Sequence, residues 1–118
     1  MSKRRLYVAS IEKDTERNRA FRRVLATGTH MQLVVQSLER GEEVGEEVHS
    51  RTDQFVRVES GRALIRLNGK AHRLLAGEAA LIPAGTRHNI LNDGVARLQF
   101  YTLYAPPEHD DGEVRTEP

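Results

Sequence analysis

The stretch GEAALIPAGTRHNILN, residues 77–92, carries the clearest structural signal in the chain. Its apolar run at residues 79–82 predicts a short strand, and the Pro-Ala-Gly sequence at residues 83–85 predicts a tight turn. Residues 87–91 then predict a return strand that carries one histidine, His88. We therefore expect a β-hairpin that presents His88 on its second strand.

A second stretch, GEEVHSRTDQFVRVESG at residues 45–61, leads into another predicted strand. Together the two stretches resemble the two signature motifs of the cupin superfamily. In residues 77–92 the glycine, Pro-x-Gly, histidine and asparagine spacing of the second motif matches at every defining position. In residues 45–61 the closing glycine and one histidine of the first motif match, as Gly61 and His49.

The resemblance implies a set of metal ligands in which two members are altered. Family members that bind metal use three histidines and one glutamate. Here the first histidine position holds Glu47 and the glutamate position holds Gln54, beside His49 and His88. Asp53 would fit the acidic position only with a shorter spacing, which puts the closing glycine out of frame, so we favour Gln54. Either set supplies one negative charge to a metal, and this compensation argues for a retained site.

The residue types agree with such a site. Glu47 and His49 are two apart, so a strand would direct both to one face. Gln54 follows on the next strand, and His88 comes from the distant hairpin. Two imidazoles, a carboxylate and an amide oxygen suit Fe(II), Mn(II), Ni(II) or Zn(II). The competing interpretation is that Glu47 belongs to a solvated acidic loop, residues 41–47, and that each histidine is structural.

Short extended segments separated by turn signals run through most of the chain. Strands are predicted at residues 21–26, 31–38, 55–59, 63–67, 71–75, 79–82, 87–91 and 95–105. This spacing indicates an all-β sandwich or barrel, and the resemblance specifies a double-stranded β-helix, or jelly-roll barrel. We expect the barrel at residues 21–105, a polar N-terminal segment at 1–20 with a helical turn or loop at 14–20, and a polar tail at 106–118. The tail is expected to be loose or packed along a partner.

Composition restricts the classes of function. The chain has 118 residues, enough for one domain, and its formal net charge of +1 gives no overall attraction to nucleic acid. It contains no cysteine, which excludes thiolate catalysis. No apolar run approaches the length of a membrane span, so we expect a cytoplasmic protein with no membrane or nucleic-acid partner. The resemblance also implies a homodimer.

The residues that would surround a ligand are less clearly marked. Tyr101 and Tyr104 lie on opposite faces of the last predicted strand, so only one of them can point inward. A tyrosine beside a metal can act as an acid or base, which makes these two the catalytic candidates. Arg57 and Arg87 are expected to face solvent or a carboxylate, although either could bind an anionic group. The candidate substrate-binding residues are Gln32, Gln36, Arg57, Phe100 and Thr102.

The resemblance is to small cupins of the mannose-6-phosphate isomerase-like group. It implies a bound divalent metal that polarises a carbonyl group and assists proton transfer. The prediction is a metal-dependent isomerase or lyase acting on a small oxygenated metabolite such as a sugar or sugar acid. Two alternatives stay open, a metal-dependent dioxygenase and a non-catalytic module that binds or senses a small molecule.

Overall fold

The computed structural model describes residues 6–118, and its regular secondary structure consists of strands and one short helix. The first five residues of the predicted N-terminal segment lie outside the described residues. One helix precedes ten strands: α1 (Ile11–Arg17), β1 (Arg22–Thr27), β2 (Gln32–Leu38), β3 (Glu47–Val48), β4 (Asp53–Ser60), β5 (Arg62–Leu67), β6 (Lys70–Leu75), β7 (Ala79–Ile82), β8 (Arg87–Leu91), β9 (Leu98–Ala105) and β10 (Val114–Arg115). The all-β prediction is confirmed.

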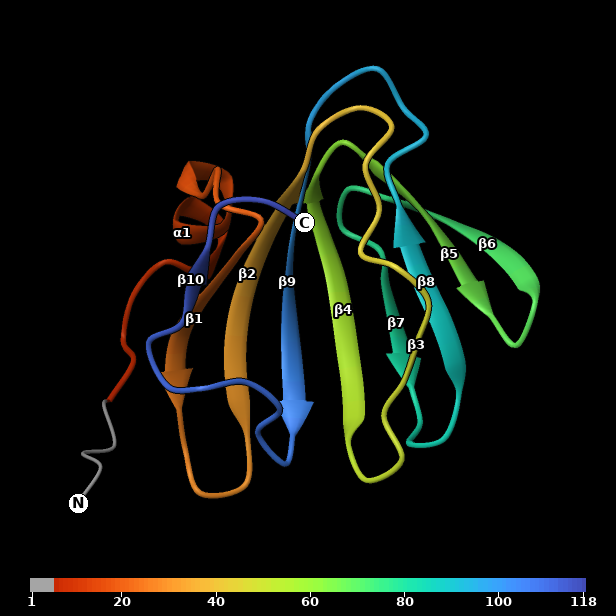
Figure 1. Cartoon of the computed structure of the whole chain (residues 1–118). Coiled ribbons are helices and arrows are strands. Elements are labelled where there is room, and N and C mark those ends of the chain that lie inside the picture. Colours follow the sequence, from red (N-terminus) through yellow and green to blue (C-terminus); the bar gives the residue numbers. More distant parts are fainter. Residues whose placement is uncertain (1–5) are drawn as a thin grey trace.

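Two antiparallel sheets face one another and form the barrel (Figure 1). The larger sheet has the strand order β10-β1-β2-β9-β4-β7, and the smaller has the order β3-β8-β5-β6. The two hairpins with the strongest turn signals form as predicted: β5 pairs with β6 through Asn68-Gly69, and the Pro83-Gly85 turn joins β7 to β8. This is the double-stranded β-helix that the sequence motifs implied.

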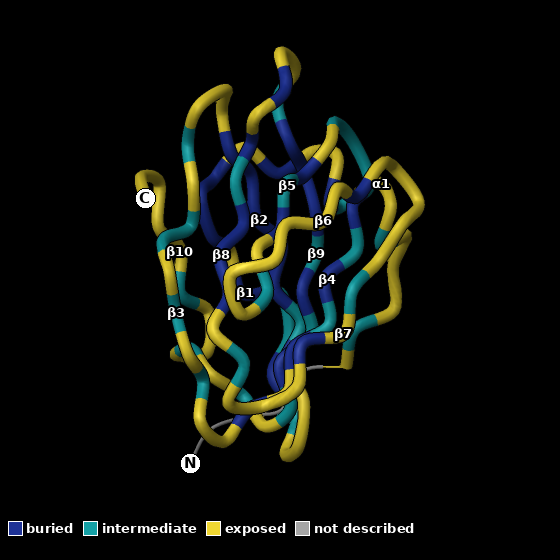
Figure 2. The backbone as a smooth tube through the Cα atoms, turned by 90° about the vertical axis from the view of Figure 1, so that its right-hand side faces the viewer, coloured by how far each residue is buried: buried dark blue, intermediate teal, exposed yellow. Residues whose placement is uncertain are grey.

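The barrel interior is polar at one end and apolar at the other. Gln32 and Gln54 are both register partners of Tyr104, so the start of β2, the start of β4 and the end of β9 lie side by side. Farther along the same strands the inward side chains become apolar, as Val58 and Phe100 show. The buried segments, dark blue in Figure 2, lie along the middle of the molecule. The apolar end forms the core, which leaves the polar end available for chemistry.

Helix α1 covers part of the outer face of the larger sheet and contacts β9, β4 and β2. The Ser10 side chain caps the helix by accepting a hydrogen bond from the Lys13 N–H. Gln99, on the outer face of β9, donates hydrogen bonds to the Glu16 and Asn18 carbonyl groups. The helix spans Ile11–Arg17, so it begins earlier than the helical turn or loop predicted at residues 14–20 and overlaps it only in part. No helix in the described part of the chain is long and apolar enough to cross a membrane.

Two predicted boundaries require correction. The last long strand was expected at residues 95–105, but β9 begins at Leu98. The Asn92 side chain accepts a hydrogen bond from the Gly94 N–H and donates one to the Ala96 carbonyl, which holds residues 93–96 in a loop. The tail at residues 106–118 was expected to be loose or packed along a partner, and it is not loose. It returns along the same barrel, and β10 pairs with β1.

Gly61, between β4 and β5, is expected to be the glycine most sensitive to substitution. Its φ is +81°, and an added Cβ would lie 2.5 Å from the Arg97 carbonyl oxygen. Gly69 has nearly the same φ, +82°, with no atom within 4 Å of an added Cβ. Gly69→Ala should cost about 1 kcal/mol for backbone strain alone. Gly61→Ala should cost about 3 kcal/mol, because the overlap with backbone adds to the same strain. Chemical unfolding of the two variants measures the difference, and equal losses would contradict the close approach.

Candidate metal centre

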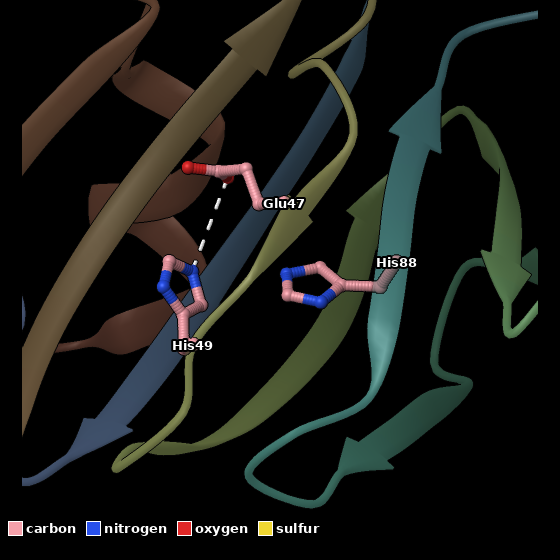
Figure 3. Close-up of side chains that lie close together, drawn as sticks. All are labelled: Glu47, His49 and His88. Carbon is pink, nitrogen blue, oxygen red and sulfur yellow. Dashed lines mark ion pairs between the residues drawn. The ribbon is translucent and has the colours of Figure 1, made fainter.

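Three side chains with metal-binding atoms converge at the polar end of the barrel. Glu47, His49 and His88 each offer one ligand atom, and these atoms lie within 4.8 Å of one another. Glu47 on β3 and His88 on β8 are register partners, and His49 follows β3 directly. Figure 3 shows the His88 side chain directed toward that of His49, with Glu47 near both. The two imidazole centroids are 5.1 Å apart.

Neighbouring backbone contacts hold the segment that carries Glu47 and His49. Asn89, beside His88, accepts a hydrogen bond from the Gly45 N–H at 2.9 Å and donates one to Glu43. The Gly85 N–H donates to the His49 carbonyl at 2.8 Å, which ties His49 to the Pro-x-Gly turn. The second motif therefore positions the first, and Glu47 is not part of a free acidic loop.

The tautomer of the His88 imidazole is set by a contact within its own hairpin. Its Nδ1 lies 2.9 Å from the Thr86 carbonyl oxygen, which can only accept a hydrogen bond. Nδ1 therefore carries the proton, and Nε2 presents a lone pair to the barrel interior. This is the arrangement that a metal-binding imidazole requires.

Gln54 and Asp53, the two candidates for the altered glutamate position, point in different directions. Gln54 is 3% exposed and lies inside the barrel as the register partner of Tyr104. Asp53 is exposed and accepts a hydrogen bond from the Ala84 N–H at 2.9 Å, so it stabilises the turn before β8. Of the two side chains, only that of Gln54 lies where it could bind a metal ion inside the barrel.

The donor atoms fit a metal ion. His49 Nε2, Gln54 Oε1 and His88 Nε2 are all buried and have no hydrogen-bond partner in the described part of the chain. Unpaired buried polar atoms are costly, about 1–3 kcal/mol each, so a group that satisfies all three would stabilise the site. Glu47 Oε1 lies 4.0 Å from His49 Nε2 and supplies the negative charge. Glu47, His49 and His88 could hold a divalent ion, with Gln54 as a fourth donor.

Glu47 and Gln54 should behave as a coupled pair in metal binding. Glu47→His leaves only neutral donors and should weaken affinity for Zn²⁺, whereas Gln54→Glu adds a second carboxylate and should alter the site charge and the metal preference. The double change restores one carboxylate, and the coupling should be about 0.5–3 kcal/mol in its favour. Calorimetric titration of the parent, both single variants and the double variant measures this value. Strictly additive losses would mean that the two side chains do not share an ion.

The two tyrosine candidates are separated by the structure. Tyr104 is 3% exposed, and its ring packs edge-on against His49 with centroids 5.9 Å apart. Burial, together with the nearby Glu47 charge, raises the pKa of the Tyr104 hydroxyl well above its usual range. Tyr101 lies on the outer face of the sheet, opposite Arg57 in the β4–β9 register. Only Tyr104 is placed beside the metal-binding group.

The substrate-binding candidates divide in the same way. Gln36 and Thr102 are buried on the inner face, where the Thr102 hydroxyl donates to Gln36 Oε1 at 3.4 Å. Phe100 belongs to the apolar core. Gln32 is fully buried, and its amide group binds the backbone of the C-terminal segment. Arg57 pairs with Glu59 at 3.2 Å on the outer face, and Arg87 lies near Glu46 at the surface, so neither arginine faces the site.

Sequence reasoning missed three residues near the site. Arg22, on β1, is buried on the inner face next to Gln36, and its Nε has no partner in the described part of the chain. The tail brings Glu108 to within 3.5 Å of His49 Nδ1, and the His109 ring packs against Tyr104. Burial and the charge of Arg22 lower the pKa of His109. The alternation of residues along β1 could have predicted that Arg22 points inward. Nothing in the sequence near residues 108 and 109 predicts the contacts that they make with the barrel.

Comparisons with known proteins agree with this geometry. The family model described as Cupin domain matches residues 34–104, which include all four candidate ligands. The protein YrkC of Bacillus subtilis is 40% identical over 114 residues, covering 92% of this chain and 61% of its own length. The chain therefore spans about three fifths of that relative.

A solved structure and a third relative add detail. The crystal structure of BH2720 from Bacillus halodurans is 44% identical, covers 95% of this chain and 89% of its own, and superimposes with a TM-score of 0.92. The tetracenomycin polyketide synthase protein TcmJ of Streptomyces glaucescens is 36% identical over 80 residues, 66% of this chain and 54% of its own length. These matches account for the barrel and for both motifs.

Proposed function

This chain belongs to the cupin family, and on that premise we propose that it is a metal-dependent enzyme. Glu47, His49, Gln54 and His88 would bind Fe, Mn, Ni or Zn. The proposed reaction is an isomerisation or lyase reaction on a small oxygenated metabolite such as a sugar acid. The observation that carries the proposal is the group of three buried donor atoms, beside one carboxylate, that have no hydrogen-bond partner among residues 6–118.

The protein's own groups suit proton transfer at a substrate oxygen. A divalent ion, when bound, supplies Lewis acidity that polarises a carbonyl group. Tyr104 lies against His49, and its phenol hydroxyl is protonated at neutral pH, as that of any ordinary tyrosine is. It is therefore placed to donate a hydrogen bond, or a proton, to an oxygen that gains negative charge.

The interior also favours an anionic substrate. The Arg22 side chain is 8% exposed, so its charge is almost fully removed from water. Only one of its contacts, Nη1 to Glu113 at 3.1 Å, neutralises that charge, and Nε is unpaired in the described part of the chain. Gln36 is the register partner of Arg22, and its buried amide nitrogen also has no hydrogen-bond partner in the described part of the chain. These two donors supply the chemistry that recognises a carboxylate or enolate oxygen.

A second candidate is a metal-dependent dioxygenase that acts on a phenolic compound. It is favoured by the likeness to the quercetin 2,3-dioxygenase of Bacillus subtilis, which is 31% identical over 85 residues, 71% of this chain and 25% of its own length. The ligand set does not decide between the two reactions, because imidazole and oxygen donors bind the same group of divalent metals.

The proposal is tested by metal analysis followed by an activity panel. Protein supplemented separately with Fe²⁺, Mn²⁺, Ni²⁺ and Zn²⁺ should retain about one ion per chain with at least one of them. The metal-loaded protein is then assayed with sugars and uronates for isomerisation or elimination, and with phenolics for oxygen consumption. Protein that stays metal-free with all four ions would overturn the proposal. Turnover of phenolics with oxygen consumption would select the second candidate.

A further inference from the structure

The C-terminal segment is attached to the barrel by a buried amide group. Gln32 Nε2 donates hydrogen bonds to Thr27 Oγ1 at 3.0 Å and to the His109 carbonyl at 2.7 Å. Gln32 Oε1 accepts from the Glu108 and His109 N–H groups at 3.1 and 3.0 Å. Gln32 is fully buried, so these bonds form away from competing water. The backbone at residues 108–109 is therefore fixed against the polar end of the barrel.

The segment is attached again farther along. The Glu113 carboxylate accepts from Arg22 Nη1 at 3.1 Å, and the Glu113 carbonyl accepts from the Val24 N–H at 2.9 Å. Strand β10 then continues the ladder on β1. Residues 108–113 are thus held at both ends, and their side chains have defined positions relative to the site.

The side chain of Glu108 reaches His49, one of the candidate metal ligands, from the side that faces away from the other ligands. Its Oε1 accepts a hydrogen bond from Thr52 Oγ1 at 3.2 Å, which orients the carboxylate. Its Oε2 lies 3.5 Å from His49 Nδ1. His49 Nε2, on the other side of the ring, is buried and unpartnered in the described part of the chain. Glu108 and the barrel interior therefore lie on opposite sides of one imidazole.

We propose that Glu108 is a positioning residue that prepares His49 for metal binding. Its carboxylate accepts a hydrogen bond from the Nδ1–H group of His49. The proton therefore stays on Nδ1, Nε2 offers a lone pair to the ion, and the ring becomes a stronger metal ligand. The Thr86 carbonyl performs the same task for His88 from within its own hairpin. The inference rests on the proposed function, because it requires that His49 binds a metal. Its consequence is that the site is complete only when the C-terminal segment is docked.

The main test compares two variants that each remove one negative charge from the same segment. Glu108→Gln should weaken Zn²⁺ or Ni²⁺ affinity about tenfold or more, as is typical of changes to the partners of metal-binding histidines. Asp110→Asn is the matched control, since Asp110 is exposed and only two residues away. It should bind these ions as the parent does. Parent affinity in Glu108→Gln, or an equal loss in both variants, would overturn the inference.

A second measurement needs no metal. Nitrogen NMR of the metal-free protein at about pH 8, where histidine is ordinarily neutral, should show His49 protonated at Nδ1. Glu108→Gln should move a measurable share of His49 to the Nε2-protonated form and leave His88 unchanged. An unchanged His49 spectrum would contradict the role of Glu108 even if affinity fell.

A double-variant cycle tests the attachment itself. Gln32→Met keeps a similar volume but removes both ends of the amide, so it should weaken metal affinity by displacing Glu108. Adding Glu108→Gln to Gln32→Met should then cost little more than Gln32→Met alone. Additive losses would show that the Gln32 contact does not act through Glu108. His88→Ala separates this inference from the proposed function, because it should weaken metal binding strongly whether or not Glu108 takes part.

Discussion

His88→Ala is expected to weaken binding of Zn²⁺ or Ni²⁺ about a hundredfold. Four-ligand sites gain about 10–16 kcal/mol on binding zinc, so loss of one donor costs about 3 kcal/mol. The reason is specific to this residue, since the Thr86 carbonyl fixes the proton on Nδ1 and leaves Nε2 as a buried donor. Calorimetric titration of metal-free protein measures the loss.

The chain offers a matched control for that experiment. His72 is exposed on β6 in the same sheet, away from Glu47 and His49, so His72→Ala makes the same chemical change outside the site. It should bind metal as the parent does. Thermal unfolding of both variants separates loss of the ligand from loss of the fold. A folded His88→Ala variant with parent affinity would show that the proposed centre does not exist.

Tyr104→Phe is expected to lower kcat about 10²–10⁴-fold on whichever substrate the panel identifies. Phenylalanine keeps the ring that packs on His49 but removes the hydroxyl that would donate a hydrogen bond or a proton to the substrate. Metal affinity should change little, because the hydroxyl is outside the proposed ligand set. Steady-state kinetics on metal-loaded protein measure the effect.

Tyr101→Phe is the control for the tyrosine experiment. Tyr101 is on the same strand as Tyr104, but its side chain lies on the outer face of the sheet, opposite Arg57. Its variant should keep parent values of kcat and KM. If Tyr101→Phe and Tyr104→Phe lost activity equally, the loss would reflect the barrel as a whole and the acid role of Tyr104 would be wrong.

Local signals predicted most of the fold. Asn68-Gly69 defines its hairpin through backbone angles that these residues adopt readily, and the Pro83–Gly85 turn does the same for β7 and β8. Alternation likewise predicted that Gln54 and His88 would be buried on faces directed inward. Each of these features depends on residues close together in the sequence, which is why they could be predicted.

The errors came from contacts between distant residues. A polar tail after two prolines resembles a loose end, because its composition does not reveal that Gln32 would bind its backbone. The buried arginine was missed for a related reason. Arg57 and Arg87 lie beside carboxylates, as expected, whereas Arg22 faces the interior through the register of β1 on β2. The pairing register of the strands, and not the residue type, decides which arginine side chain lies inside the barrel.

The way in which Gln32 binds the tail has a consequence for protein engineering. It recognises main-chain groups of residues 108 and 109, which every amino acid except proline provides. The side chains at these two positions can therefore be exchanged while the anchoring bonds are kept. One points toward His49 and the other toward Tyr104. The tail thus offers two adjustable positions beside the reactive end of the barrel, where libraries of variants could alter metal preference or selectivity without redesign of any strand.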